Sequence, residues 1–386
     1  MSKNTKVAIG ALVILAVLFI GYQSVQKSGP LSDTGDIVIG VLQPLTGDAA
    51  SYGESELHAI QVAVDEINKA GGVLNRKITI VPEDGKCDPQ AGGTAAQKLV
   101  NINTVKIIIG GACSGETLAA AAITEPAKVI LLSPSASSPK VTAAGDFVFR
   151  TYPSDALAGK VNAAYAIKKL GYRKAALITE LTDYAQGLRE VYKKTFTEMG
   201  GTIVADETYT TGTTDFRTQV LKIKTAKPDV VYVVVQSPTP GISIFRQLRE
   251  GGVKAGYTTA EVLLDRQIVK DNAAVLEGVI GVEVAVDYDG NPKAKAFRDA
   301  HRAMFQGKDP GSFGANAYDA VYLVKDAIIA SGGVDTVKIR DWLYGVKNWQ
   351  GAVGSLTMDG NGDPLLGLSV RKILNGVVTN LASFGA

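Results

Sequence analysis

The side chains best suited to ligand chemistry directly follow short apolar runs. Ser114 follows the run 106–109 and precedes an alanine-rich segment of helical period, so we expect it at the N-cap of a helix. The free backbone N–H groups of a helix N-terminus bind anions, and a carboxylate placed there would also meet the serine hydroxyl. Ser114 is therefore either a plain helix cap or a carboxylate ligand.

Glu261 offers the opposite charge in the loop 260–262, after another short β-branched run. It would neutralise a ligand ammonium, or else it is a solvated surface carboxylate. The loop 133–139 contains small serines between two prolines, which let backbone carbonyls and hydroxyls approach an ammonium. An ordinary Pro/Ser loop is the alternative interpretation.

Aromatic and amide side chains occupy three further loops of this kind. Tyr52 in the segment 44–53 would cover a ligand from above, or it is an exposed tyrosine on a surface turn. The loops 179–187 and 236–238 contribute Tyr184 and Gln236.

The two cysteines of the chain, Cys87 and Cys113, each follow a short strand-like segment. An exported chain meets an oxidising environment, which favours a disulfide over a metal site. The bridge would close a loop of about two dozen residues and stabilise the fold by about 3 to 4 kcal/mol. Two buried, unpaired thiols are the alternative.

The segment 1–35 predicts export. Lys3 and Lys6 precede an unbroken apolar run, 7–22, and a flexible tether follows at 24–35. The run is short for a membrane span, but no clear small-x-small cleavage site follows it. Both a cleaved signal peptide and a retained membrane anchor stay open, and the anchor is favoured. We expect the protein in the periplasm or on the outer face of the cytoplasmic membrane.

Composition and motifs exclude several classes of function. The 40 basic and 38 acidic residues give a net charge of +2 without a long basic block, which argues against nucleic acid as a partner. The chain has no G-x-S-x-G, Walker A or G-x-G-x-x-G motif, and its two histidines lie in helix-like stretches, which argues against an enzyme. The acidic segment 359–363 resembles the start of a calcium loop, but Pro364 and Val370 occupy required positions, so we expect a hairpin turn. We predict neither a metal nor a cofactor.

Short β-branched runs alternate with segments of helical period, which predicts an α/β fold with two doubly wound, parallel-sheet lobes. The expected strands are 37–42, 78–81, 106–109 and 129–132 in lobe I, and 175–179, 202–207, 230–235 and 256–259 in lobe II. The expected helices are 56–69, 91–101, 116–127, 157–170, 186–199, 216–226, 242–250, 294–305, 317–330 and 337–344. A hairpin is expected from 368–374 and 377–381, around Asn375-Gly376.

We expect the lobes to be discontinuous in sequence. Lobe I would comprise 36–152 and 284–353, lobe II would comprise 153–283, and 354–386 would supply hinge-crossing strands and a lobe II tail. Three crossings, near 152, 284 and 353, would form the hinge. Ligands of open α/β sheets bind beyond the carboxyl ends of the strands, so the loops described above would surround one cleft.

Over residues 37–384 the chain resembles the periplasmic binding proteins for leucine, isoleucine and valine, the type I solute receptors of ABC importers. The matching segments, in order, are 44–47, Tyr52-Gly53, 71–73, 84–89, Cys113-Ser114, 134–139, 184–187, Asp215-Phe216, 318–320 and 354–363. Their order and spacing together are specific.

This resemblance implies roles for individual residues. Cys87 and Cys113 would correspond to the family disulfide, and Ser114 would hold the α-carboxylate of an amino acid. Ser135, through its backbone, and Ser137, through its hydroxyl, would reach the α-amino and carboxylate groups.

The other lobe would complete the site. Tyr184 and Glu261 would close from lobe II, with Glu261 pairing the ammonium, and Tyr52 would line the side-chain pocket. One departure matters: Gln236 stands where leucine-binding members often carry tyrosine, and the first loop carries Asp48. Both residues are more polar, which leaves room for a polar amino acid, an amide or a small carboxylic acid.

The predicted function is capture of an amino acid, branched-chain or related, by lobe closure and its delivery to the permease of an ABC importer. A receptor for small amides or carboxylic acids and a sensory ectodomain of the same fold are the alternatives. We expect a monomer.

Overall fold

A computed structural model describes residues 35–385 of the chain. The predictions of a signal peptide and a membrane anchor concern residues outside this range. Within it, no helix combines the length and apolar character that a membrane crossing requires. The described chain folds around two mainly parallel sheets flanked by helices, which confirms the predicted fold class.

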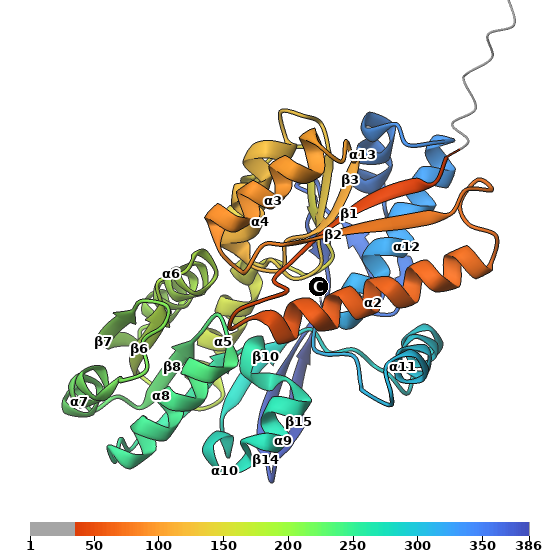
Figure 1. Cartoon of the computed structure of the whole chain (residues 1–386). Helices are drawn as coiled ribbons and strands as arrows, with labels where there is room; N and C mark the ends of the chain where they lie inside the picture. Colours follow the sequence, from red (N-terminus) through yellow and green to blue (C-terminus); the bar gives the residue numbers. More distant parts are fainter. Residues whose placement is uncertain (1–34, 386) are drawn as a thin grey trace, which may run out of the picture. The chain divides into compact units, whose positions relative to one another are not determined.

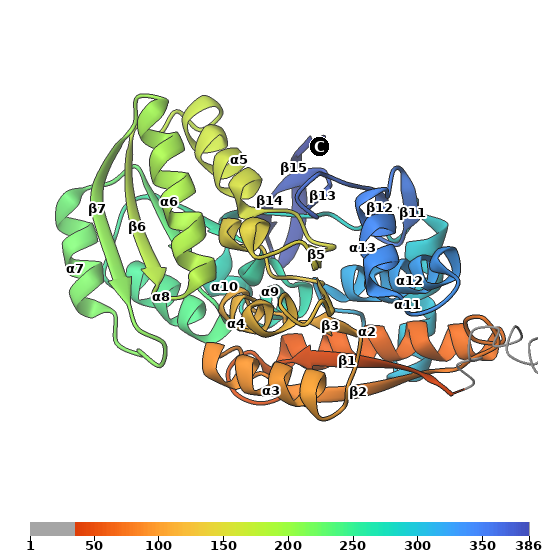
Figure 2. The same ribbon diagram turned by 90° about the horizontal axis from the view of Figure 1, so that it is seen from above.

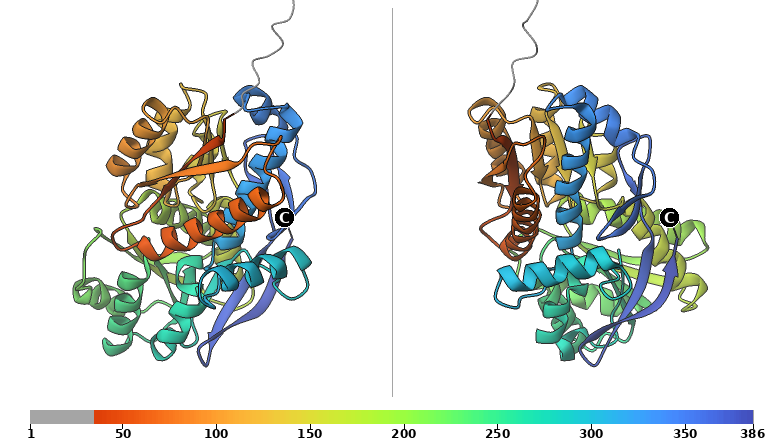
Figure 3. Two further views of the ribbon diagram at one scale, coloured as in Figure 1. Left: turned by 45° about the vertical axis from the view of Figure 1, so that its right-hand side comes forward. Right: turned by 90° about the vertical axis from the view of Figure 1, so that its right-hand side faces the viewer.

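The first sheet has five parallel strands in the order β2-β1-β3-β4-β5. Its strands are β1 (Ile37–Gln43), β2 (Ile78–Asp84), β3 (Ile107–Gly110), β4 (Ile130–Ser133) and β5 (Val148–Arg150). Helices α2 (Ala50–Lys69) and α12 (Gly314–Ser331) pack together on one face, and α3 (Pro89–Asn101) and α4 (Ser114–Thr124) on the other (Figures 1 and 3). Helix α11 (Pro292–Met304) packs against α2, and α13 (Thr336–Tyr344) against α12.

Burial on both faces explains why these strands are short, continuous apolar runs. In β3, Ile107 and Ile109 belong to the core beneath α2 and α12, whereas Ile108 belongs to the core beneath α3 and α4. Successive side chains of a strand point to opposite faces, so each face requires its own apolar residues.

The second sheet has seven strands in the order β15-β14-β10-β9-β8-β6-β7. Five are parallel: β6 (Lys174–Glu180), β7 (Thr202–Tyr209), β8 (Val230–Val234), β9 (Gly256–Ala260) and β10 (Ile280–Glu283). Helix α5 (Asp155–Lys168) packs beside α6 (Asp183–Glu198), and α7 (Arg217–Ala226) beside α8 (Pro238–Glu250) (Figure 2). The short elements η2 (Glu261–Leu264), α9 (Arg266–Asp271) and α10 (Ala273–Leu276) lie between β9 and β10 in the sequence.

An antiparallel hairpin of β14 (Leu368–Leu374) and β15 (Val377–Phe384) completes the second sheet next to β10. Asn375 and Gly376 form its two-residue turn with φ of 51° and 73°, which only residues tolerant of the left-handed region adopt readily. The predicted hairpin is therefore confirmed.

A small antiparallel sheet contains β11 (Trp349–Gly351), β12 (Gly354–Met358) and β13 (Pro364–Leu365). The acidic segment 359–363 joins β12 to β13, and Asp359 Oδ1 accepts the backbone N–H groups of Asn361 and Asp363 at 2.7 and 3.0 Å. This confirms the expected turn. Among the described residues, no group of side chains is arranged to hold a metal ion.

Local differences from the prediction affect the site. Helix α2 begins at Ala50 and not near residue 56, so Tyr52 lies in its first turn and not in a loop. The N-cap of α4 is Cys113, so Ser114 is the first helical residue and the predicted N-cap position is wrong. Strands β5 and β10 were not predicted, because such short segments carry little periodic signal. The residue boundaries of the two lobes stay predictions.

Candidate functional site

A pocket lies at the carboxyl ends of the parallel strands. Six of the seven predicted ligand-binding residues line it: Tyr52, Ser114, Ser135, Tyr184, Gln236 and Glu261. The remaining lining residues are Glu56, Ala112, Cys113, Val262 and Phe313. Ser137 does not line the pocket, although it is buried nearby at 1% exposure.

Ser114 lines the pocket and is only 1% exposed. Its hydroxyl oxygen accepts the backbone N–H of Ser138 at 3.1 Å, and its own hydrogen remains available to a ligand acceptor. The preceding residue, Cys113, forms a disulfide with Cys87, with 5.2 Å between the Cα atoms. The disulfide confirms the predicted pairing and fixes the loop that carries Ser114.

The N-terminus of α4 is less open than the sequence suggested. The carboxylate of Glu116 accepts the backbone N–H of Cys113 at 3.2 Å, so an acidic side chain of the protein already occupies part of this helix end. Burial raises the pKa of Glu116 to about 8, and this hydrogen bond opposes the shift only in part.

The serine loop after β4 is ordered by internal hydrogen bonds. The Ser135 hydroxyl donates to the Ala112 carbonyl at 3.0 Å, and the Ser137 hydroxyl donates to Asp155 Oδ2 at 2.8 Å. The Ser133 hydroxyl accepts the backbone N–H of Ala136 at 2.9 Å. Asp155 therefore engages the hydroxyl that the resemblance assigned to the ligand.

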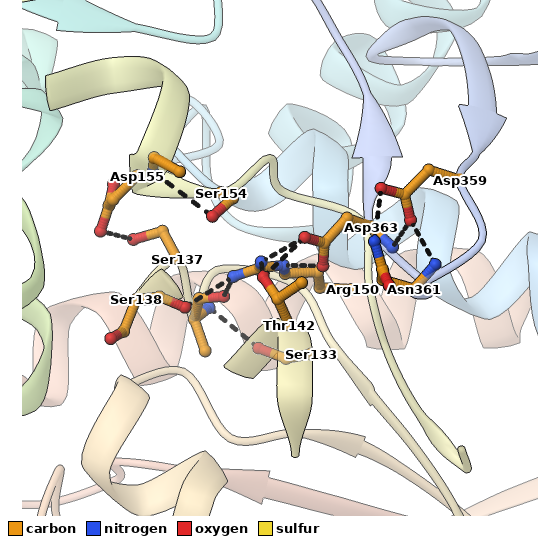
Figure 4. A network of polar contacts seen from close by, with 12 residues as sticks. Ser133, Ser137, Ser138, Thr142, Arg150, Ser154, Asp155, Asp359, Asn361 and Asp363 are labelled. Carbon is orange, nitrogen blue, oxygen red and sulfur yellow. Dashed lines mark hydrogen bonds and ion pairs between the residues drawn. The ribbon is translucent and has the colours of Figure 1, made fainter. Parts of the chain in front are cut away.

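Arg150, at the end of β5, forms hydrogen bonds with this loop (Figure 4). No role was predicted for this residue from the sequence. Its side chain is 0% exposed and forms a bidentate ion pair with Asp363, at 2.5 and 2.6 Å. The same guanidinium donates to the carbonyls of Ala136 and Ser138 at 3.3 and 3.0 Å. The turn 359–363 and the serine loop are thus joined through one buried cation. The only signal for this role in the sequence was a single arginine at the end of an apolar strand.

Elements of the second sheet supply an acidic and aromatic wall. The Tyr184 hydroxyl donates to Glu261 Oε1 at 2.9 Å, and both side chains are almost fully buried. Glu261 Oε2 has no hydrogen-bond partner among the described residues. Burial raises the pKa of Glu261 to about 7, although Tyr184 and a backbone N–H favour the ionised form. Burial, and then the charge of Glu261, raises the pKa of Asp155 well above its usual range.

Gln236 follows β8 and is half-buried at the pocket. Its backbone N–H donates to Glu180 Oε2 at 2.8 Å, which fixes the backbone and leaves the amide side chain at the pocket wall. Asp48, the other polar departure noted in the sequence, is exposed and is not a lining residue.

Direct contacts join the two sides of the pocket. The Tyr52 hydroxyl donates to the carbonyl of Val262 at 2.9 Å, and Lys140 Nζ pairs with Asp183 at 2.7 Å. Tyr52 is therefore half-buried against the second sheet's elements and is not an exposed surface residue. Its ring meets Phe313 edge-on, with 5.9 Å between centroids.

Sequence reasoning missed Glu56, Val262 and Phe313. Glu56 lies one helical turn after Tyr52, so a helix starting at Ala50 would have placed both side chains on one face. Phe313 precedes α12, far from Tyr52 in sequence, and no local pattern connects the two.

The fold and the pocket define a two-lobed α/β binding protein, in which elements beyond the carboxyl ends of two mainly parallel sheets line one pocket. A model of the periplasmic binding protein family matches residues 36–365, and the chain belongs to this family. This membership confirms the resemblance inferred from the motifs. The protein is a solute-binding protein and not an enzyme, and it acts outside the cytoplasm.

Relatives of similar length are about 30% identical to this chain. The leucine-, isoleucine-, valine-, threonine-, and alanine-binding protein of Pseudomonas aeruginosa is 30% identical over 85% of this chain and 87% of its own length. The Leu/Ile/Val-binding protein homolog 3 of Brucella melitensis is 31% identical over 85% and 88%.

Solved structures agree with the fold. The branched-chain amino acid transporter substrate binding protein LivJ of Streptococcus pneumoniae, in complex with isoleucine, is 30% identical with a TM-score of 0.82, covering 91% of this chain and 99% of its own. A solute binding protein of Rhodopseudomonas palustris in complex with benzoate has a TM-score of 0.83 at 22% identity and covers 91% and 97%. At that identity the likeness extends to the fold alone.

Proposed function

We propose that the protein captures an α-amino acid between its two lobes and delivers it to the permease of an ABC importer. The observation that carries this proposal is the placement of Ser114 and Glu261 in one buried pocket. Burying a zwitterion requires a partner for each charged end, since an unpaired buried charge costs several kcal/mol. Ser114 offers a hydroxyl to the carboxylate, and Glu261 offers an anion to the ammonium.

The remaining lining residues have supporting roles. Tyr184 orients Glu261 through its hydroxyl, and the backbone of the Ser135 loop, which lines the same pocket, would approach the amine. Ser137 acts through Asp155, because its hydroxyl is already bonded to that carboxylate. Tyr52 and Phe313 would enclose the side chain of the ligand.

Closure of the lobes would be the step that a permease recognises. A ligand that contacts both walls binds the closed arrangement more tightly than the open one, and it shifts the equilibrium by that difference. The contact from Tyr52 to Val262 joins the two walls, and opening of the lobes would break it. Retention of the N-terminal segment in the membrane and a monomeric state remain part of this proposal.

A simple carboxylic acid fits the pocket less well than an amino acid. Its anion would share a buried space with Glu261, and none of the residues lining the pocket is basic. An amide ligand would leave the charge of Glu261 without a counterion. The amino acid is the class that supplies a partner to both walls.

A thermal-shift screen tests this function. The purified protein is heated with each of the twenty amino acids, small amides and small carboxylic acids. We expect the largest rise in Tm with an amino acid, because a ligand at about 100 times its Kd stabilises the folded state by about 2.7 kcal/mol. Mass spectrometry should recover that ligand unchanged. A carboxylic acid or an amide as the sole stabilising compound would refute the proposal.

A further inference from the structure

Gly187 lies in the second turn of α6, a position that its backbone does not reserve for glycine. Its φ is not positive, so a side chain would cause no backbone strain there. Within a helix alanine is the more favourable residue, because glycine loses more conformational entropy on folding. The absence of a side chain at position 187 therefore requires another explanation.

The opposite wall of the pocket lies very close to Gly187. A Cβ atom added to Gly187 would lie 2.8 Å from Cδ of Pro139 and 3.1 Å from Oγ of Ser138. Carbon atoms in favourable contact are about 3.5–4.0 Å apart, so a side chain does not fit. The segment 138–139 follows β4 of the first sheet, whereas α6 follows β6 of the second sheet (Figure 1). The steric conflict would thus arise between the two walls.

The segment 138–139 is held in place on its own side. The backbone N–H of Ser138 donates to the Ser114 hydroxyl at 3.1 Å, and its carbonyl accepts from the Arg150 guanidinium at 3.0 Å. Ser138 is 0% exposed, and Cδ of Pro139 belongs to a rigid ring. Moving this segment would displace Ser114, which lines the pocket.

The helix that carries Gly187 is fixed as well. The side-chain amide of Gln186 donates to the carbonyl of Glu180 at 2.7 Å. Three residues before Gly187, Tyr184 donates to the Glu261 carboxylate at 2.9 Å. A side chain at position 187 would therefore be accommodated by separating the two walls.

A second glycine lies at the same contact. Gly115 is the second residue of α4, and an added Cβ would lie 3.3 Å from Oδ2 of Asp183, the first residue of α6. It would also lie 3.1 Å from Cγ of Pro89. Helices α4 and α6 thus each have a glycine where the two walls meet.

We infer that full closure of the lobes requires glycine at position 187, and that a larger residue there holds the walls apart and weakens ligand binding. This inference rests on the proposed function, since it names a residue on which closure depends. Gly187 does not line the pocket, so it acts through closure and not through contact with the ligand. A ligand enclosed by two walls leaves when they separate, so the loss should appear as faster dissociation.

Calorimetric titration and stopped-flow measurement of ligand release test the inference. Each of the twenty amino acids is titrated into the full-length wild-type protein, and the tightest ligand is then used with the variants. We expect Gly187→Ala to weaken binding about tenfold and Gly187→Val about 100-fold, in line with the cost of overpacking. The dissociation rate should increase by most of this factor, and the association rate should change little. Small-angle X-ray scattering at saturating ligand should give a larger radius of gyration for both variants.

Gly93→Ala is the matched control. Gly93 also lies within a helix, α3, but an added Cβ would meet only the Ala119 side chain at 3.8 Å, an ordinary contact. This variant should bind the ligand as the wild type does. Pro139→Ala removes the ring carbon nearest to position 187, so Gly187→Ala should cost less affinity in that background. Without ligand the walls are free to separate, so Gly187→Ala should not lower the free energy of unfolding.

Wild-type affinity and dissociation rate in Gly187→Ala would overturn the inference and leave the proposed function intact. An equal loss in Gly93→Ala, or an undiminished cost of Gly187→Ala in the Pro139→Ala background, would do the same. A slower association rate together with a lower free energy of unfolding would indicate a purely structural role and would also overturn it. Absence of binding by every amino acid to the wild type would overturn both proposals. Gly187→Ala decides the matter even if Gly187→Val does not fold.

Discussion

Replacing Glu261 with glutamine tests the ammonium contact directly. The substitution preserves the size of the side chain and an oxygen for the Tyr184 hydroxyl, which lies 2.9 Å from Glu261 Oε1. It removes only the negative charge. A loss of amino-acid binding in Glu261→Gln would therefore reflect the electrostatic contact and not a change in packing.

The magnitude follows from burial. Glu261 is 2% exposed, so a ligand ammonium beside it would be shielded from water as well. Removing one partner of a buried ion pair costs about 3–5 kcal/mol, which corresponds to a loss in affinity of about 100-fold to 1,000-fold or more. A matched carboxylic acid that lacks the amine should bind Glu261→Gln at least as well as the wild type, because the repulsion is gone.

The same contact predicts a pH dependence. Burial raises the pKa of Glu261 to about 7, and an ammonium beside it would lower this value. Binding then releases a proton, so affinity is full above about pH 7 and falls at lower pH, by up to about tenfold per pH unit. Asp155 and Glu283 are the other acids whose charges couple to Glu261, and both remain in Glu261→Gln.

Calorimetric titrations between pH 5 and pH 8 measure both effects, with the amino acid that the screen identifies and its analogue without the amine. Glu250→Gln is the control, since Glu250 is exposed at the end of α8. Equal losses for the two ligands would refute the assigned role of Glu261. A wild-type affinity that does not change with pH would contradict the proton release.

Three further outcomes are expected. Arg150→Met should lower the free energy of unfolding by about 3–5 kcal/mol in denaturant titrations and weaken ligand binding, because the carboxylate of Asp363 loses its buried partner. Reduction of the Cys87–Cys113 disulfide should lower the Tm. The disulfide closes a loop with a sequence separation of 26 and stabilises the fold by about 3–4 kcal/mol. Glu56→Gln should stabilise the protein more at pH 8 than at pH 5, by up to a few kcal/mol in chemical denaturation. The pKa of Glu56 is about 8 in the folded state and lower in the unfolded state, so the wild type loses stability as the pH rises from the unfolded pKa to the folded pKa. Glutamine does not titrate and avoids this loss. An unchanged free energy of unfolding in Arg150→Met would contradict the first prediction, and an unchanged Tm after reduction would contradict the second. A difference between Glu56→Gln and the wild type that does not depend on pH would contradict the third.

The fold was largely predictable because its signals are local. Continuous apolar runs such as 107–109 have a side chain for each face of a doubly covered sheet, and the Asn375-Gly376 turn requires the conformations those two residues tolerate. The first turn of α2 was missed, since it lacks a side-chain cap and begins among small residues. Short strands such as β5 depend on their partners in the sheet and not on their own sequence.

The site was predictable only where a loop follows a strand. Ser114 and Glu261 were found because each lies beyond the carboxyl end of a parallel strand, and the topology brings those ends together. Arg150 and Asp363 escaped notice, because their pairing joins positions 213 residues apart. Glu56 was not predicted as a lining residue for a different reason. An acidic residue in a helical segment is normally exposed, and only the tertiary structure shows that Glu56 is buried.

The acidity of the pocket bears on how closure is controlled. Glu261 is buried, burial and then the charge of Glu261 raise the pKa of Asp155, and none of the residues lining the pocket is basic. Closing the lobes without a cation would leave the buried Glu261 to take up a proton or to keep its charge unpaired. Among the contacts that join the walls, the exposed pair of Lys140 and Asp183 contributes about 1 kcal/mol at most. Under the proposed function, a ligand ammonium would remove this electrostatic penalty, so the chemistry that recognises the ligand would also determine when the lobes close.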